Sequence, residues 1–240
     1  MLKIENLTKT FGSYTAVNSI NINIKEGDLF GFLGPNGAGK TTTIKMIVGL
    51  FSPTSGEIHF NGMNIKTDPI EVKKIFGYVP DQPYIYEKLT GKEFLYFSGG
   101  LYDLSKKEIK ERIDELVELM KIGDWLNKRT EEYSQGMKQR ITFASAFLHH
   151  PKLLVIDEPM IGLDPQSAHV VKNVLKQKAK EGMSIFMSTH SLNVAEEICT
   201  RVGIINKSEM IFDDSIDALQ KMKNEMERNF EELFMELTRD

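Results

Sequence analysis

A glycine-rich run, GPNGAGKTT at residues 34–42, constrains the fold of this chain more than any other part of its sequence. It fits G-x-x-x-x-G-K-[ST], a loop whose glycines let backbone N–H groups turn inward around phosphate oxygens. The largely apolar residues 28–33 before it, DLFGFL, predict a short strand, and residues 42–50 after it predict a helix whose N-terminus faces the anion. This order predicts an α/β fold that binds a nucleotide; a chance glycine-rich turn is the alternative.

The positions of this loop have separate expected roles. We expect the Lys40 ammonium group to reach the β- and γ-phosphates and to take part in catalysis, and the Thr41 hydroxyl group to bind Mg²⁺. The loop residues expected to contact the nucleotide are Asn36, Gly37, Ala38, Gly39, Lys40, Thr41 and Thr42.

Residues 153–158, LLVIDE, form an apolar run that ends in two adjacent acids. A buried strand brings its last residues to the carboxyl edge of the sheet, where ligands of open α/β folds bind. We therefore expect Asp157 to hold Mg²⁺ together with Thr41, and Glu158 to act as general base on the attacking water. Without the phosphate loop, the same pair would indicate only a polar strand end.

His190 follows a second apolar run, residues 184–188, which predicts a neighbouring strand ending at the same edge. We expect its imidazole to contact the γ-phosphate and to hold the attacking water. A structural or solvated histidine is the alternative. The other four histidines lack such a setting, and we assign them no role.

The composition disfavours several classes of protein. The net charge of −4 argues against a nucleic-acid partner, because such domains normally carry a basic surplus. The single cysteine, Cys199, cannot form an intramolecular disulfide, which favours a reducing cytosol. No apolar run approaches the roughly 18 residues of a membrane span. We therefore expect a soluble chain, so that any membrane part is another polypeptide.

Hydrophobic periodicity predicts the remaining elements. Alternating apolar residues between positions 2 and 24 predict two early strands with one polar face. Apolar residues at three- and four-residue spacings predict a helix at 106–120. Other predicted elements are strands at 57–61, 152–157 and 184–188 and helices at 136–148, 167–181 and 192–199.

These elements predict a single domain with a parallel sheet interrupted by helices. The predicted parts are a core at 1–90 and 150–214, a helical subdomain at about 91–149 and a helical tail at 215–240.

The order of the motifs resembles that of the ATP-binding subunit of an ABC transporter, over essentially the whole chain. The resemblance is carried by the phosphate loop, the helical insert, YSQGMKQR at 133–140, LLVIDEP at 153–159, GLD at 162–164 and STH at 188–190. The signature YSQGMKQ and the ending LFMELT at 233–238 are most similar to bacterial drug- and bacitracin-type exporters and the Ecs transporter. The resemblance implies a P-loop NTPase of ABC type: a mostly parallel sheet core, a small antiparallel N-terminal sheet and an inserted helical subdomain.

The resemblance also implies an activity and partners. The chain would be an ATPase using ATP and Mg²⁺, driving separate transmembrane permease subunits, for export, from the cytoplasmic face of the cell membrane. ATP would lie between two ATPase subunits, in a homodimer or a heterodimer, and residues 81–95 would contact the permease. One alternative is a non-transport ABC ATPase, which coiled-coil arms or a basic patch would favour. Another is a regulatory protein that barely hydrolyses ATP, which Glu158 and His190 disfavour.

Signature residues are assigned by the same resemblance. Ser134, Gln135, Gly136 and Met137 would contact the nucleotide bound by the partner subunit, at a helix N-terminus that favours an anion. The family usually has two glycines and a glutamine after the serine, so Gln135 and Met137 are departures, and Met137 cannot hydrogen-bond like an amide. Asp164 resembles the aspartate of the dimer contact.

The resemblance places other residues around the base and the metal. Phe11 occupies the position of the aromatic that stacks on adenine, with Tyr14 as a second candidate and a core phenylalanine as the alternative for Phe11. Val17 belongs to the same nucleotide-binding set. Asp81, rather than Gln82, aligns with the glutamine that senses Mg²⁺, and either could be a metal ligand. Alternatively, Asp81 only caps the turn after the preceding proline.

Overall fold

The computed structural model describes residues 1–225 and residue 234. The predicted helical tail is therefore seen as α8 (Ile216–Glu225), and the ending LFMELT, apart from Phe234, lies outside the described residues. Within residues 1–225 and 234, no helix is long and apolar enough to span a bilayer.

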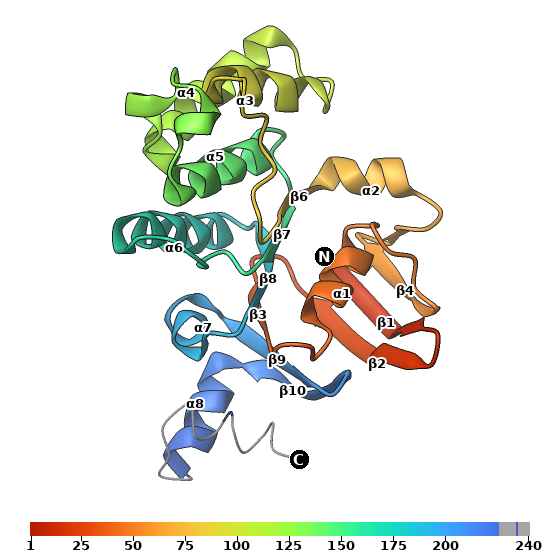
Figure 1. Ribbon diagram of the computed structural model, residues 1–240. Helices are drawn as coiled ribbons and strands as arrows, with labels where there is room; N and C mark the ends of the chain where they lie inside the picture. The colour runs from red at the N-terminus through yellow and green to blue at the C-terminus, as the bar shows by residue number, and fades with distance from the viewer. Residues whose placement is uncertain (226–233, 235–240) are drawn as a thin grey trace.

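A six-stranded sheet forms the centre of the molecule (Figure 1). All its neighbouring strands run parallel except the last pair, β10 and β9, which is antiparallel. In spatial order the strands are β10 (Glu209–Ser215), β9 (Arg201–Asn206), β3 (Leu29–Leu33), β8 (Ser184–Thr189), β7 (Leu153–Asp157) and β6 (Phe76–Val79). Every residue of β3, β7 and β8 is buried, which explains their largely apolar sequences. The predicted mostly parallel sheet is confirmed, although β6, β9 and β10 were not predicted as strands.

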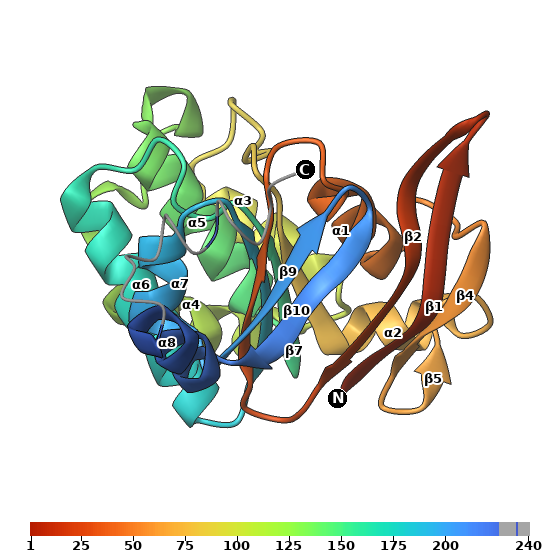
Figure 2. The same ribbon diagram turned by 90° about the horizontal axis from the view of Figure 1, so that it is seen from below.

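A second, antiparallel sheet lies beside the central one, with α1 (Lys40–Ile47) between the two (Figure 2). Its strands in spatial order are β2 (Tyr14–Ile24), β1 (Leu2–Phe11), β4 (Ser55–Phe60) and β5 (Met63–Asn64). Alternating apolar residues of β1 and β2, among them Ile4 and Ile22, point inward and join Ile44 of α1 in one buried cluster. This packing holds the phosphate loop, which leads from β3 into α1, between the two sheets.

Three helices gather at one end of the molecule, near β6 (Figure 1). They are α3 (Gly91–Gly100), α4 (Lys106–Met120) and α5 (Gln135–Phe147), and α2 (Pro69–Ile75) precedes β6. Thr90 and Ser105 begin α3 and α4 with capping boxes, in which hydroxyl and glutamate side chains satisfy the free N–H groups of the first turn. The helix α4 has the bounds that its apolar spacing predicted.

Two further helices, α6 (Pro165–Lys180) and α7 (Leu192–Ile198), cover the face of the central sheet opposite α1 (Figures 1 and 2). α6 begins two residues earlier than predicted, because Asp164 caps it and Pro165 fills its first position. Similarly, α1 begins directly after Gly39 rather than at Thr42. β3, β7 and β8 end side by side at one edge of the sheet, and the sequence motifs follow these ends.

Candidate nucleotide-binding and catalytic site

The phosphate loop follows β3 and touches strands of both sheets. Gly37 and Gly39 adopt φ angles of 82° and 115°, which residues with a Cβ atom seldom occupy. A Cβ on Gly39 would lie 2.5 Å from the carbonyl oxygen of Ala16 on β2, and a Cβ on Gly34 would collide with the carbonyl oxygen of Ile205 on β9. Glycine at these positions therefore lets the loop lie directly against the backbone of both sheets.

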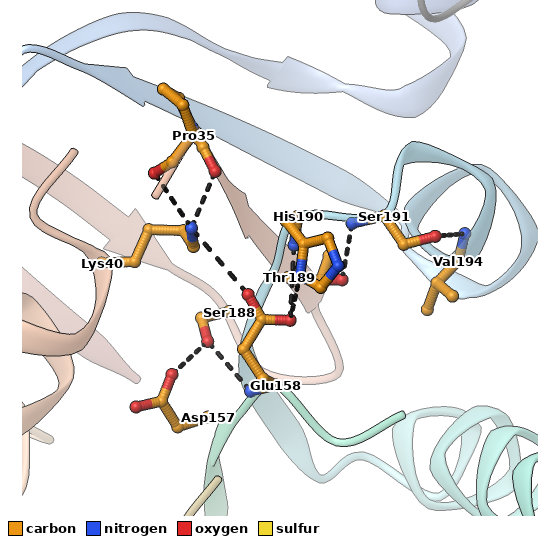
Figure 3. A network of polar contacts seen from close by, with 10 residues as sticks. Pro35, Lys40, Asp157, Glu158, Ser188, Thr189, His190, Ser191 and Val194 are labelled. Atoms are coloured by element: carbon orange, nitrogen blue, oxygen red, sulfur yellow. Dashed lines mark hydrogen bonds and ion pairs between the residues drawn. The ribbon is translucent and has the colours of Figure 1, made fainter. Parts of the chain in front are cut away.

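The side chain of Lys40 turns back into this loop. It is only 7% exposed, and its Nζ donates hydrogen bonds to the carbonyl oxygens of Gly34 (2.7 Å) and Pro35 (3.2 Å) (Figure 3). Glu158 Oε1 lies 3.8 Å from the same nitrogen. Burial lowers the pKa of Lys40, whereas the charges of Glu158 and Asp157 raise it. The ammonium group thus adds to a loop and a helix N-terminus that already favour an anion.

Asp157, the last residue of β7, is buried beside two hydroxyl groups. Its Oδ1 accepts a hydrogen bond from Ser188 Oγ at 2.5 Å. The pKa of Asp157 is raised overall, chiefly because the carboxyl group is buried and also because the Asp81 carboxylate is negative. Hydrogen bonds from the Ser188 and Thr41 hydroxyl groups lower the pKa and offset part of this rise. The result is a sheltered carboxyl group, close to other negative charge, that a bound cation would stabilise.

Glu158 leaves β7 with a φ of 49°, an uncommon angle for a residue other than glycine. Its backbone N–H donates to Ser188 Oγ (3.1 Å), and its carboxylate faces His190 at the end of β8 (Figure 3). Glu158 Oε2 lies 3.0 Å from His190 Nδ1 and accepts a longer bond, 3.4 Å, from the backbone N–H of His190. The Glu158 side chain is 13% exposed and that of His190 is 55% exposed. A sheltered carboxylate and an accessible imidazole can act together on one water molecule.

A depression of about 350 Å³ brings most of the predicted residues together. It is lined by Glu158, His190 and the loop residues Asn36, Gly37, Gly39, Lys40, Thr41 and Thr42. Two further lining residues, Ala16 and Ile161, were not predicted from the sequence. Ile161 lies between the motifs LLVIDEP and GLD, and this position was the one signal that could have indicated it.

Two residues predicted to contact the nucleotide have buried side chains: Val17 on β2 and Ala38 within the loop itself. Val17 is 0% exposed and Ala38 is 4% exposed. A Cβ on Gly39 would meet Val17 Cγ2 at 3.3 Å, so Val17 packs against the loop from inside the protein. In this structure, therefore, Val17 supports the loop and does not line the depression. The alternation of β2 is interrupted at Ser19 (φ 50°), so Val17 and Ile20, three residues apart, both face the core.

Two aromatic side chains border the same depression. Phe11 is 46% exposed, so the alternative of a core phenylalanine is wrong. Its ring meets Phe51 edge-on at 5.8 Å between centroids, and Lys9 Nζ lies 5.0 Å from its centroid. The Tyr14 hydroxyl donates to the carbonyl oxygen of Gly37 at 3.5 Å. Both aromatic residues are therefore accessible from the depression, and their stacking on adenine stays a prediction.

The signature residues lie elsewhere, at the start of α5. Ser134 and Gln135 are exposed, and the Ser134 hydroxyl caps the helix by accepting a bond from the Met137 N–H (3.2 Å). Gly136 is buried, because its backbone lies against Asp164 and Ser167 at the start of α6; a Cβ on it would lie 2.8 Å from Asp164 Oδ2. Gly136 and Asp164 thus contact each other within one chain, in addition to their predicted roles toward a partner.

Asp81 and Gln82 are both exposed and line a separate hollow of about 680 Å³ between β6 and the helices α3 and α5. The negative charge of the Asp81 carboxylate contributes to the raised pKa of Asp157. Burial raises the pKa of Tyr78 to about 12, with smaller contributions from the carboxylates of Asp157 and Asp81. The Gln82 amide carries no charge and shifts no pKa, so which of the two residues senses the metal stays a prediction.

The donors at this edge fit Mg²⁺. In nucleotide sites this ion typically takes one or two carboxylates and completes its shell with phosphate oxygens and water. Asp157 offers a buried carboxylate, and the Thr41 hydroxyl is beside it. Residues 1–225 and 234 contain no cluster of three or more His, Cys, Asp or Glu side chains placed to hold a metal by themselves.

Comparison with known proteins gives a consistent result. The sequence model of the family described as ABC transporter matches residues 17–161. The linearmycin resistance ATP-binding protein LnrL of Bacillus subtilis (strain 168) is 40% identical over 211 residues, 88% of this chain and 68% of LnrL. The bacitracin transport ATP-binding protein BcrA of Bacillus licheniformis is 39% identical over 222 residues, 92% of this chain and 72% of BcrA. A solved ATP-binding subunit of an ABC transporter superimposes with a TM-score of 0.90 at 31% identity, covering 99% of both chains.

Proposed function

This chain belongs to the ABC transporter family as an ATP-binding subunit that hydrolyses ATP, and from that premise we propose that it powers export. In this proposal, it dimerises on ATP and drives separate membrane subunits from the cytoplasmic face of the membrane. The observation that carries the proposal is the convergence of Lys40, Asp157, Glu158 and His190 at the ends of three neighbouring strands.

The proposed division of labour follows from this geometry. Lys40 and the loop N–H groups hold the phosphates of ATP. Thr41 and Asp157 would hold Mg²⁺, which supplies neutralisation of phosphate charge when bound. Glu158 accepts the proton of the attacking water, and His190, 3.0 Å from its carboxylate, keeps that carboxylate and the water in place.

A second subunit is proposed because the signature lies outside the depression. Ser134 and Gln135 are exposed at the N-terminus of α5, whose free N–H groups favour an anion. Ile161, 52% exposed at the rim of the depression, offers an apolar contact to a neighbour. A second copy, identical or related, would bring its own α5 over the nucleotide bound here.

Export through membrane subunits is supported by the relatives and by one exposed surface. LnrL is named for linearmycin resistance and BcrA for bacitracin transport. Among the residues that line the hollow beside Asp81, Tyr84 is 89% exposed, and Tyr86, two residues further along the chain, is 57% exposed. We propose that the permease docks here, within the predicted segment 81–95.

Glu158→Gln tests the catalytic part of this proposal. The amide keeps the size of the side chain but cannot accept the proton, so ATP hydrolysis should fall by roughly 10²–10⁴-fold. ATP binding should persist, and ATP should now hold the variant as a dimer, measured by size-exclusion chromatography with light scattering. Glu118→Gln, at an exposed position on α4, is the matched control and should hydrolyse ATP at the parental rate. Parental hydrolysis by Glu158→Gln would contradict the assignment of the base.

Ser134→Arg, combined with Glu158→Gln, tests the dimer. Ser134 is exposed, so the larger side chain fits the monomer but obstructs a nucleotide on the partner. The double variant should bind ATP and stay monomeric; a normal ATP-dependent dimer would contradict the model.

Tyr84→Asp tests the membrane partner. An integral membrane protein should co-purify with the tagged parent from its native membranes and should be lost with Tyr84→Asp. Ile70→Asp, at another exposed apolar position, should retain it.

A further inference from the structure

The hydroxyl group of Ser188 lies between the two acids of the site (Figure 3). Ser188 is 0% exposed, within β8. Its Oγ is 2.5 Å from Asp157 Oδ1 and 3.1 Å from the backbone nitrogen of Glu158. One buried atom therefore contacts both the expected metal ligand and the expected base.

The strand register explains why these groups meet. Ser188 of β8 is the direct partner of Asp157 on β7, and paired residues on parallel strands project their side chains from the same face. A hydroxyl group has one hydrogen to donate, and an ionised carboxylate can only accept. The Ser188 hydrogen is therefore directed at Asp157, which leaves an oxygen lone pair to accept the N–H of Glu158. The direction of both hydrogen bonds is fixed by this chemistry.

Each hydrogen bond has a consequence for the reaction. The bond to Oδ1 holds the Asp157 carboxylate in one orientation and leaves Oδ2 free of Ser188. The bond from the Glu158 N–H stabilises a backbone at φ 49°, which is otherwise unfavourable for a glutamate. This backbone turn directs the Glu158 carboxylate toward His190 and Lys40 and away from Asp157.

We propose that Ser188 is a positioning residue for ATP hydrolysis: its hydroxyl couples the orientation of the Asp157 carboxylate to the backbone conformation of Glu158. The inference rests on the proposed roles of these two acids. It goes beyond them because it requires the metal ligand and the base to be aligned by one side chain that touches neither nucleotide nor water. Removing the hydroxyl should impair metal use and catalysis together, while Mg²⁺-free nucleotide binding remains.

Ser188→Ala tests the proposal against Ser184→Ala. Ser184 lies on the same strand, is equally buried and also donates a hydrogen bond, to the carbonyl oxygen of Lys25 at 2.9 Å, but at the far end of β8. We expect Ser188→Ala to lower kcat about tenfold, as loss of a hydrogen bond to a charged group would, and to raise the Mg²⁺ midpoint of hydrolysis. Fluorescent mant-ATP should bind it with parental affinity in EDTA and more weakly than the parent in Mg²⁺.

Ser184→Ala should match the parent in kcat, Mg²⁺ midpoint and mant-ATP binding. Ser188→Thr, which keeps a hydroxyl, should recover most of the kcat that Ser188→Ala loses. The proposal is overturned if Ser188→Ala has the parental kcat and Mg²⁺ midpoint, or if Ser184→Ala shows the same losses. If Ser188→Ala does not fold, Ser188→Cys replaces it, and a Cys variant as active as the Thr variant overturns the proposal.

The Glu158→Gln variant separates this inference from the proposed function. If Glu158→Gln hydrolyses ATP at the parental rate, the assignment of the base fails whatever the Ser188 variants do. If Glu158→Gln is inactive and Ser188→Ala is fully active in Mg²⁺, only the role of Ser188 fails.

Discussion

Replacing Gly136 with alanine should separate the start of α5 from the start of α6. The new Cβ would lie 2.8 Å from Asp164 Oδ2 and 3.0 Å from Ser167 Cβ, both too close for an unshifted backbone. Asp164 cannot simply move away, because it caps α6 by accepting bonds from the Ser167 N–H (2.9 Å) and the Ser167 hydroxyl (2.6 Å). Either the two helices move apart or the cap of α6 breaks.

Three contributions set the size of the effect. Overpacking a tight contact costs about 1–3 kcal/mol, and loss of an N-cap costs about 1 kcal/mol. Alanine in place of glycine within a helix returns about 1 kcal/mol. Because the cap breaks only if the helices stay close, the first two contributions do not fully add. We expect the free energy of unfolding to fall by up to about 3 kcal/mol.

Urea unfolding followed by circular dichroism measures this change. The matched control is Gly100→Ala, at the end of α3, where a new Cβ would have no atom within 4 Å. The control should be neutral or slightly stabilised. If Gly136→Ala and Gly100→Ala unfold at the same urea concentration, the close packing of α5 on α6 is refuted. Ser134→Arg also perturbs its own chain, because it removes the hydroxyl that caps α5, at about 1 kcal/mol, but Ser134 is exposed and the larger side chain has room in the monomer.

Two further predictions concern metal use and pH. Asp81→Ala should raise the Mg²⁺ concentration that gives half-maximal hydrolysis, because it removes a carboxylate close to Asp157, while Gln82→Ala should leave it unchanged; the reverse result would place the metal-sensing role on Gln82. Burial lowers the pKa of His149 from 6.5 to about 4, so between these values the unfolded chain binds more protons than the folded one. The free energy of unfolding should therefore fall by up to about 2–3 kcal/mol as the pH drops from 6.5 to 4. His149→Phe, which keeps the ring stacked on Tyr102, should show a flatter pH profile in chemical denaturation, and an unchanged profile would contradict this cause.

The sequence by itself determined the features that depend on neighbouring residues. The glycine spacing at 34–39 predicted the phosphate loop, because positive φ angles and close backbone approach are local requirements. Buried apolar runs predicted β3, β7 and β8, and with them the edge at which Asp157, Glu158 and His190 emerge. The amphipathic spacing of α4 gave its bounds for the same reason, since one helix face must be apolar to pack.

The tertiary structure alone decided which of these elements meet, and in which register. Ser188 bridges Asp157 and Glu158 only because β7 and β8 pair residue against residue. Along the chain, Ser188 and Asp157 are 31 residues apart. Val17 is buried beneath the loop rather than exposed to the nucleotide, because β2 presents that face to α1 and the central sheet. Such contacts depend on the packing of distant segments, and a shift of one residue between paired strands would reverse which side chains face the site.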